Sequence, residues 1–110
     1  MQLMRINSLS HYQNLRNDCV FLIVLFHEGS EQDHLLRSAV DFLQSDTELE
    51  LPDIYTVDIN EHKELCKTQG VDTTMLLLLK DDCELDRFLN PNIQIVEYLV
   101  SRVLNDVVKF

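Results

Sequence analysis

The sequence has little glycine, little proline and an excess of acidic over basic residues. Two glycines and two prolines in 110 residues leave little room for flexible linkers, and they exclude a glycine-rich phosphate-binding loop. Nine Lys and Arg residues against nineteen Asp and Glu give a formal net charge of −10. This charge repels phosphate backbones and anionic lipid headgroups, so it argues against nucleic acid and membrane surfaces as partners. It favours either a basic partner protein or solubility alone.

The sequence also lacks the cysteine pattern of a disulfide-bonded or zinc-binding protein. Cys19, Cys66 and Cys83 form an odd set without close pairs, so we expect reduced thiols. The four histidines have no spacing that suits a metal site. The acidic residues within 81–86 lack the glycine and the alternation of a calcium-binding loop. We therefore expect neither a metal nor a cofactor.

Long apolar segments are absent as well. The longest apolar runs, Val20–Phe26 and Met75–Leu79, are too short to cross a bilayer and indicate buried strands. The first residues, MQLMRIN, lack the basic and apolar regions of a signal peptide. We therefore expect a cytoplasmic protein.

What the chain does have is enough apolar sequence, 45% of its residues, for the core of one domain. The apolar pattern predicts strands over residues 3–7, 19–26, 53–59, 75–79 and 84–89. Helices are expected between these strands and at the end of the chain. Their predicted starts and ends are Ser8 or Ser10 to about Asn17, Ser30 into the polar stretch 45–50, Asn60 to Gly70, and Asn90-Pro91 onward.

This pattern gives the element order β-α-β-α-β-α-β-β-α. Parallel βαβ units followed by a hairpin and a helix predict one mixed sheet between two layers of helices, a three-layer α/β/α sandwich. A flavodoxin-type layout is the main alternative. It would need a further parallel strand where this sequence has a hairpin.

Three segments of the chain resemble thioredoxin. They are VFLIVLF before a glycine and a capped helix, TVDINEHKELCKTQGV, and MLLLLKDDCEL with its hairpin. The resemblance covers almost the whole chain in pattern, with few identical residues. It implies a single thioredoxin-like domain over residues 1–110.

The functional residues of that family are missing. Where thioredoxins have a tryptophan and Cys-x-x-C, this chain has Phe26, His27, Glu28, Gly29, Ser30, Glu31, Gln32 and Asp33. The position of the family's cis-proline falls at Thr74, after Thr73. Because a non-proline cis peptide costs about 3–4 kcal/mol, we expect a trans bond there. The second strand also has no acidic residue before Glu28, although the resemblance implies a buried acid.

Two groups of residues remain as candidates for chemistry. Ser30 and Asp33 stand at a predicted helix start, where helix capping is favoured over a nucleophile that uses His27 or His34 as its base. Cys66 lies in a predicted helix near Lys63 and Lys67 and is the cysteine considered for a redox role, but packing is the favoured role of all three cysteines.

Our leading hypothesis is a redox-inactive, thioredoxin-like domain that binds another protein as an adaptor or chaperone-like accessory and is not an enzyme. Its predicted binding surface is residues 26–33 together with Thr73 and Thr74, and no residue is assigned a catalytic role. The alternative is an atypical single-cysteine redox protein that uses Cys66. A third possibility is a homo-oligomer joined through the edge strand 3–7 or the last helix.

Overall fold

The structure is a computed structural model that describes residues 3–28, 38, 41, 45 and 53–108 of the chain. Its elements in chain order are β1 (Leu3–Arg5), α1 (Leu9–Asp18), β2 (Phe21–His27), β3 (Ile54–Asp58), α3 (Lys63–Gln69), β4 (Met75–Lys80), β5 (Cys83–Leu89) and α4 (Ile93–Val108). All five predicted strands are present, each within two residues of its expected bounds. The helix predicted after Gly29 lies outside the described residues, apart from residues 38, 41 and 45, which are helical.

The five strands form one mixed sheet in the order β1-β3-β2-β4-β5. β1, β3 and β2 are parallel, and β4 and β5 form an antiparallel hairpin that continues the sheet. The hairpin confirms the predicted mixed sheet and excludes the flavodoxin-type alternative. β2 lies in the centre, which explains its unbroken apolar sequence, because both of its faces are covered.

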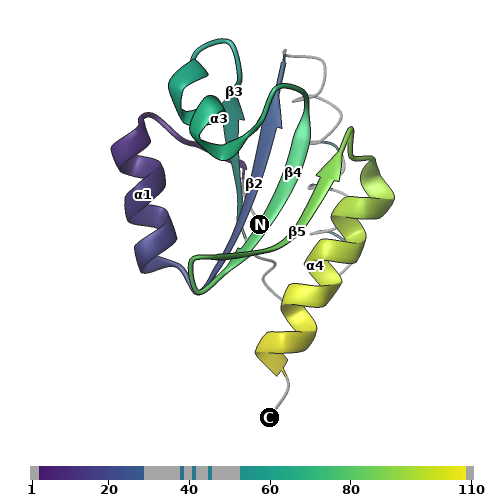
Figure 1. The fold of residues 1–110 in the computed structure, drawn as a ribbon. Helices are drawn as coiled ribbons and strands as arrows, with labels where there is room; N and C mark the ends of the chain where they lie inside the picture. Colours follow the sequence, from purple (N-terminus) through teal and green to yellow (C-terminus); the bar gives the residue numbers. More distant parts are fainter. Residues whose placement is uncertain (1–2, 29–37, 39–40, 42–44, 46–52, 109–110) are drawn as a thin grey trace.

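The described helices cover the sheet on both faces (Figure 1). Tyr12 of α1 and Leu65 of α3 pack on one face, and Leu99 of α4 packs on the other. Each of these side chains is at most 2% exposed. Burying a side chain of this size stabilises a fold by about 1.5–3 kcal/mol. None of the described helices has the length and apolar character needed to cross a membrane.

The strand register brings three chain segments to one end of the sheet. Phe26 near the end of β2 pairs with Val57 of β3 and with Met75 at the start of β4. The segments that follow β2 and β3 therefore lie beside the segment that leads into β4. The opposite end carries the β4–β5 turn, in which Asp81 and Asp82 have φ values of 50° and 67°. Two left-handed residues in succession are typical of a tight hairpin turn.

The predicted residue at the start of α3 is wrong, and the predicted residue at its end is confirmed. Asn60 does not cap this helix, which begins at Lys63 after His62. Instead the Asn60 backbone N–H donates to Asp58 Oδ1 at 2.8 Å, and its side-chain amide donates to the Glu28 carbonyl at 3.1 Å. These two bonds hold Asn60 in a turn before the helix. At the other end Gly70 has φ 68°, as the left-handed end of a helix requires.

The predicted start of α4 is also wrong. Asn90 is left-handed, with φ 46°, and its N–H donates to the Thr74 carbonyl at 2.9 Å. Asparagine tolerates this conformation, which turns the chain out of β5 and delays the helix. The cap is Asn92, whose Oδ1 accepts from the Ile95 N–H at 3.0 Å, so Pro91 precedes the helix.

Candidate functional site

The predicted binding surface is described in part. Residues 26–28, 73 and 74 are described, whereas residues 29–33, including Ser30 and Asp33, lie outside the described part of the chain. The pairing of Phe26 with Met75 brings the two described pieces together. The side chains of residues 26, 27 and 74 are buried, and those of 28 and 73 reach the surface. This surface stays a prediction.

The loop that corresponds to the family's cis-proline has an ordinary backbone. No cis peptide bond occurs within the described residues, so the bond before Thr74 is trans, as expected. The hydrogen bond from Asn90 to the Thr74 carbonyl fixes this loop to the end of β5.

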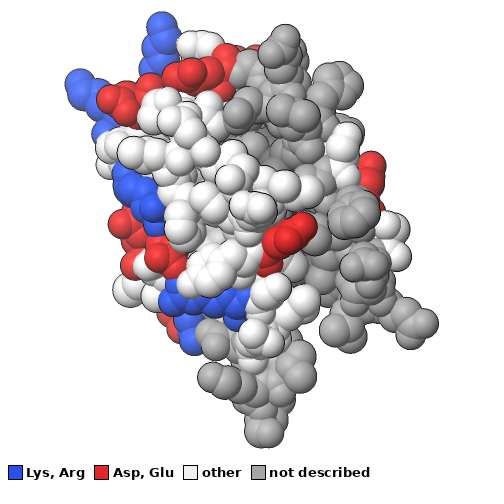
Figure 2. All heavy atoms as spheres, turned by 90° about the vertical axis from the view of Figure 1, so that its right-hand side faces the viewer, with Lys and Arg blue, Asp and Glu red and all other residues white. Residues whose placement is uncertain are grey.

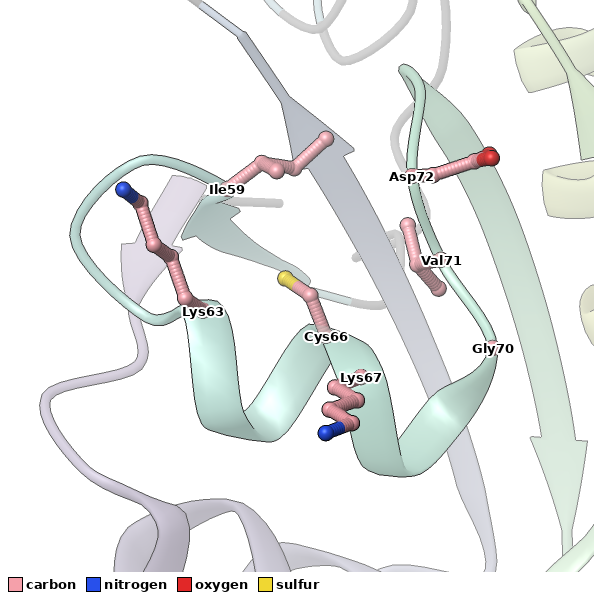
Figure 3. Close-up of a pocket in the computed structure, with 7 residues that line it drawn as sticks. All are labelled: Ile59, Lys63, Cys66, Lys67, Gly70, Val71 and Asp72. Carbon is pink, nitrogen blue, oxygen red and sulfur yellow. The ribbon is translucent and has the colours of Figure 1, made fainter.

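An open cavity of about 460 Å³ lies beside this surface. Figure 3 shows it between the end of β3, helix α3 and the segment after α3. Its lining residues are Ile59, Lys63, Cys66, Lys67, Gly70, Val71 and Asp72. The Ile59 N–H donates to the His27 carbonyl at 2.9 Å, and Asp72 directly precedes Thr73. The cavity therefore adjoins the predicted surface, and its volume falls in the range of about 300–1,000 Å³ that is usual for ligand-binding clefts.

The cavity has an apolar floor and a cationic rim. Cys66 and Val71 are 2% and 6% exposed, and Ile59 is half-buried. The Cys66 sulfur points from α3 toward Ile59, whereas the amino groups of Lys63 and Lys67 extend outward from the helix (Figure 3). Both lysines are exposed. A ligand in this cavity would contact apolar carbon and sulfur below and the two lysines at one edge, while Asp72 lines the opposite edge with its carboxylate pointing away from Cys66 (Figure 3).

The two lysines of the rim differ from the other described basic residues. Each described arginine forms an ion pair with a carboxylate, and Lys80 lies over the Phe21 ring at 5.2 Å. The arginine pairs are Arg5–Glu61, Arg16–Asp82, Arg87–Glu84 and Arg102–Asp86. Within the part of the chain that the structure describes, the amino groups of Lys63 and Lys67 have no ion pair and no hydrogen bond.

The Cys66 thiol is poorly suited to nucleophilic chemistry. Burial raises its pKa, and the Asp58 carboxylate raises it further. Both effects favour the neutral thiol, and the thiolate is the reactive form. Cys66 therefore contributes to the wall of the cavity mainly as an apolar group.

The other two cysteines lie away from this cavity. Cys83 is exposed at the start of β5, at the opposite end of the sheet. Cys19 is half-buried, and its pKa is raised by burial and then by Asp18. All three cysteines are free. Among the described residues, no three His, Cys, Asp or Glu side chains gather closely enough to hold a metal ion.

A second hollow, of about 270 Å³, lies between α1 and α3. Here the Tyr12 hydroxyl and the Arg16 Nη1 both donate to Gln69 Oε1, at 2.9 and 3.0 Å. The Arg16 Nε also donates to Asp82 Oδ1 at 2.5 Å. Four polar side chains of this hollow, Tyr12, Arg16, Gln69 and Asp82, thus form a network that links α1, α3 and the β4–β5 turn.

The end of α3 is held by Arg87 of β5. Its Nη2 donates to the Gln69 carbonyl at 2.9 Å, and its Nη1 donates to the Gly70 carbonyl at 3.3 Å. A cation at this place satisfies the last carbonyl groups of the helix. Gly70, which lines the cavity, is therefore fixed to the sheet.

The face formed by β5 and α4 carries exposed apolar side chains. Leu89, Ile93 and Tyr98 are 64%, 43% and 53% exposed. Figure 2 shows this side of the molecule, where most charged side chains lie along the left margin and the middle is largely uncharged apart from an acidic group. The predicted homo-oligomer would place α4 in an interface, and it stays a prediction.

Sequence reasoning noted Cys66 between two lysines and did not predict the cavity. The available signal was the pair Lys63 and Lys67, four residues apart on one helix in an acidic chain. Like charges at this spacing are neighbours on a helix surface. The contributions of Ile59 and Val71 had no such signal, because they depend on how the two loops pack.

The chain has a thioredoxin-like fold. Similar solved structures include a variant thioredoxin from Halobacterium salinarum, with 14% identity and a TM-score of 0.73 over 92% of this chain and 89% of that chain. Plasmodium falciparum thioredoxin has 14% identity and a TM-score of 0.72 over 90% and 97% of the two chains. Fasciola hepatica thioredoxin has 16% identity and a TM-score of 0.70 over 90% and 97%.

No protein-family model matches the sequence, and no curated protein matches it significantly. The likeness to thioredoxins therefore concerns the fold.

Proposed function

We propose that this thioredoxin-like domain binds another protein, as an adaptor or chaperone-like accessory, and does not catalyse dithiol–disulfide exchange. The observation that carries the proposal is the open cavity beside α3. It adjoins the described part of the predicted surface, and its apolar floor suits side chains of a partner. The binding surface would combine this cavity with Glu28, Thr73 and the segment 29–33.

The chemistry of the thiols supports a binding role. The segment FHEGSEQD, at the end of the central strand and beyond it, contains no cysteine. A dithiol mechanism needs two cysteines that can approach each other, and a reactive thiol needs a lowered pKa. The pKa of Cys66 is raised instead.

The free thiols and the net charge support two further parts of the proposal. Three unbridged cysteines suit a reducing compartment, which supports the cytoplasm as the proposed location. The net charge of −10 would attract a partner of positive overall charge from a distance.

The second candidate is the single-cysteine redox protein. The place of Cys66 in the cavity wall favours this candidate, whereas its burial and raised pKa count against it. Alkylation of the native protein at neutral pH separates the two candidates. We expect the exposed Cys83 to react first and Cys66 to react only as fast as the protein opens. Rapid alkylation of Cys66 would support the redox candidate.

The binding proposal is tested by two measurements on the full chain. In an insulin-reduction assay with dithiothreitol, we expect no rate above the reagent alone. In capture from a lysate of the source cells, we expect a partner that is retained by the wild type and lost from the double variant Glu28→Lys, Glu31→Lys. Asp18→Lys, on α1 at the opposite end of the sheet, is the matched charge control for each of the single variants Glu28→Lys and Glu31→Lys. Catalytic reduction of insulin would contradict the proposal.

A further inference from the structure

We infer that the cavity beside α3 receives a short acidic and apolar segment of the partner. An apolar side chain would cover Ile59, Cys66 and Val71, and a neighbouring carboxylate would lie beside Lys63 and Lys67. This inference rests on the proposed function, because it assumes a protein partner. It adds the chemistry by which that partner is recognised.

The first observation that supports an acidic segment is that the two lysines are unpaired. The chain has nineteen acidic residues, and the described arginines all have a carboxylate partner. Glu64 stands on the same short helix, yet neither Lys63 nor Lys67 forms an ion pair with it or with another described residue. Two like charges four residues apart slightly disfavour a helix. An anionic group from outside would relieve that repulsion.

The second observation is the apolar floor of the cavity, which supports an apolar side chain in the segment. Ile59, Cys66 and Val71 place two aliphatic side chains and a neutral thiol next to one another. These atoms cannot hydrogen-bond strongly to the water above them, so an apolar side chain that displaces the water gains free energy. The cavity thus selects an apolar group and a negative charge at neighbouring positions.

A preference for a negatively charged segment is compatible with an acidic protein because charge–charge interactions weaken with distance. Charges separated by more than about 10 Å are largely screened at physiological ionic strength. A carboxylate in direct contact with the two lysines is attracted most strongly by them, because Coulomb attraction grows as the distance falls, and Asp58 and Asp72 at the cavity oppose it. A long acidic segment would also meet the acidic remainder of the surface. For this reason the segment must be short.

The probes are three short synthetic peptides that share a central leucine and phenylalanine. Aspartates flank this pair in the first peptide, asparagines in the second and lysines in the third. Each is titrated into the ¹⁵N-labelled full chain, and binding is followed at the amides of Ile59, Cys66 and Val71. Variants Lys63→Glu, Lys67→Glu and their double are compared with Lys80→Glu at the opposite end of the sheet. The double variant Lys63→Arg, Lys67→Arg keeps the charge.

We expect the aspartate peptide to bind about 5-fold to 10-fold more tightly than the asparagine peptide, as two exposed ion pairs would give. The Glu double variant should lose this preference and favour the lysine peptide, whereas Lys80→Glu and the Arg double variant should keep it. Raising NaCl from about 0.05 M to about 0.5 M should shrink the difference. Equal affinity for the three peptides, no saturable change at the cavity amides, or an unchanged preference in the Glu double variant would overturn the inference.

These results are separable from a failure of the proposed function. A cellular partner that is lost with Glu28→Lys, Glu31→Lys but retained by Lys63→Glu, Lys67→Glu would overturn the acidic segment and leave the binding role standing. Insulin reduction at a catalytic rate would overturn the binding role.

Discussion

The two hollows that flank α3 are alike in position and opposite in the state of their polar groups. Between α1 and α3, Tyr12, Arg16, Gln69 and Asp82 bond to one another. In the cavity beyond α3, the lysine amino groups have no partner among the described residues. The first arrangement holds the helices together, and the second leaves charge available to a ligand. The state of the polar groups thus distinguishes a structural contact from a candidate site.

The energetic reason is burial, which is complete for Tyr12 and partial for Arg16 and Gln69, while Asp82 at the edge of the first hollow is exposed. A buried donor or acceptor that loses its partner costs about 1–3 kcal/mol, because it can no longer bond to water. An exposed lysine remains hydrated whether or not it has a partner. Substitutions in the first hollow should therefore change stability, and substitutions of the rim lysines should change binding alone.

The largest effect is expected from Tyr12→Ala. Tyr12 is 1% exposed, and removing its ring would leave a cavity in the core, at a cost of about 3–5 kcal/mol in the free energy of unfolding. Urea denaturation measures this change. Tyr12→Phe is the control, because it keeps the ring and removes one hydrogen bond, at a cost of about 1 kcal/mol. Equal stability of the two variants would show that the ring is not part of the core.

Arg16→Ala should have the next largest effect. The substitution removes the bonds to Gln69 and Asp82, and we expect a loss of about 1–2 kcal/mol in urea denaturation. Arg5→Ala removes an exposed ion pair with Glu61 and should cost less than about 0.5 kcal/mol. If Arg16→Ala lowered the free energy of unfolding no more than Arg5→Ala does, the bonds of Arg16 to Gln69 and Asp82 would not stabilise the fold.

Alkaline pH should lower stability moderately, and in part through the cavity wall. Burial raises the pKa values of Cys66 and Tyr12, so the folded state retains protons that the unfolded chain releases. The stability contribution is therefore complete below the ordinary thiol pKa, near 8.5, and declines as pH rises above it. Urea titrations at rising pH should show this decline, with a smaller slope in Cys66→Ala. An identical slope in that variant would exclude Cys66 as a cause.

The smallest change in stability is expected for the double variant Lys63→Ala, Lys67→Ala. Both side chains are exposed and unpaired, and the free energy of unfolding should stay within about 0.5 kcal/mol of the wild type. A loss above about 1 kcal/mol in the free energy of unfolding would show that the rim lysines also have a structural role, and the two hollows would then not differ in this respect.

The fold was predictable because its signals are local. The apolar runs that became β2 and β4, and the stripe of α4, specify burial directly through residue type and spacing. The positions of Asn60 and Asn90 were predicted wrongly as caps. Each residue can cap a helix, but each forms its hydrogen bond with a distant strand end or loop, which sequence spacing does not encode.

The candidate site was predictable only in part. The resemblance to thioredoxin implied that residues 26–33 lie beside Thr73 and Thr74, and the strand register pairs Phe26 with Met75, the residue after Thr74. The cavity depends on Val71 and Ile59, which approach Cys66 only when two loops have packed. Residues 29–33 lie outside the described part of the chain, so their share of the site stays a prediction.

The contact of Arg87 with the end of α3 has a consequence for the strength of binding. Because its guanidinium joins β5 to the Gln69 and Gly70 carbonyls, one wall of the cavity moves with the sheet. Little conformational entropy then remains to be lost in that wall when a ligand arrives, and a preformed receptor retains more of its contact energy as affinity. The Arg87 guanidinium on the edge strand would thus keep the cavity in its binding conformation before any partner is present.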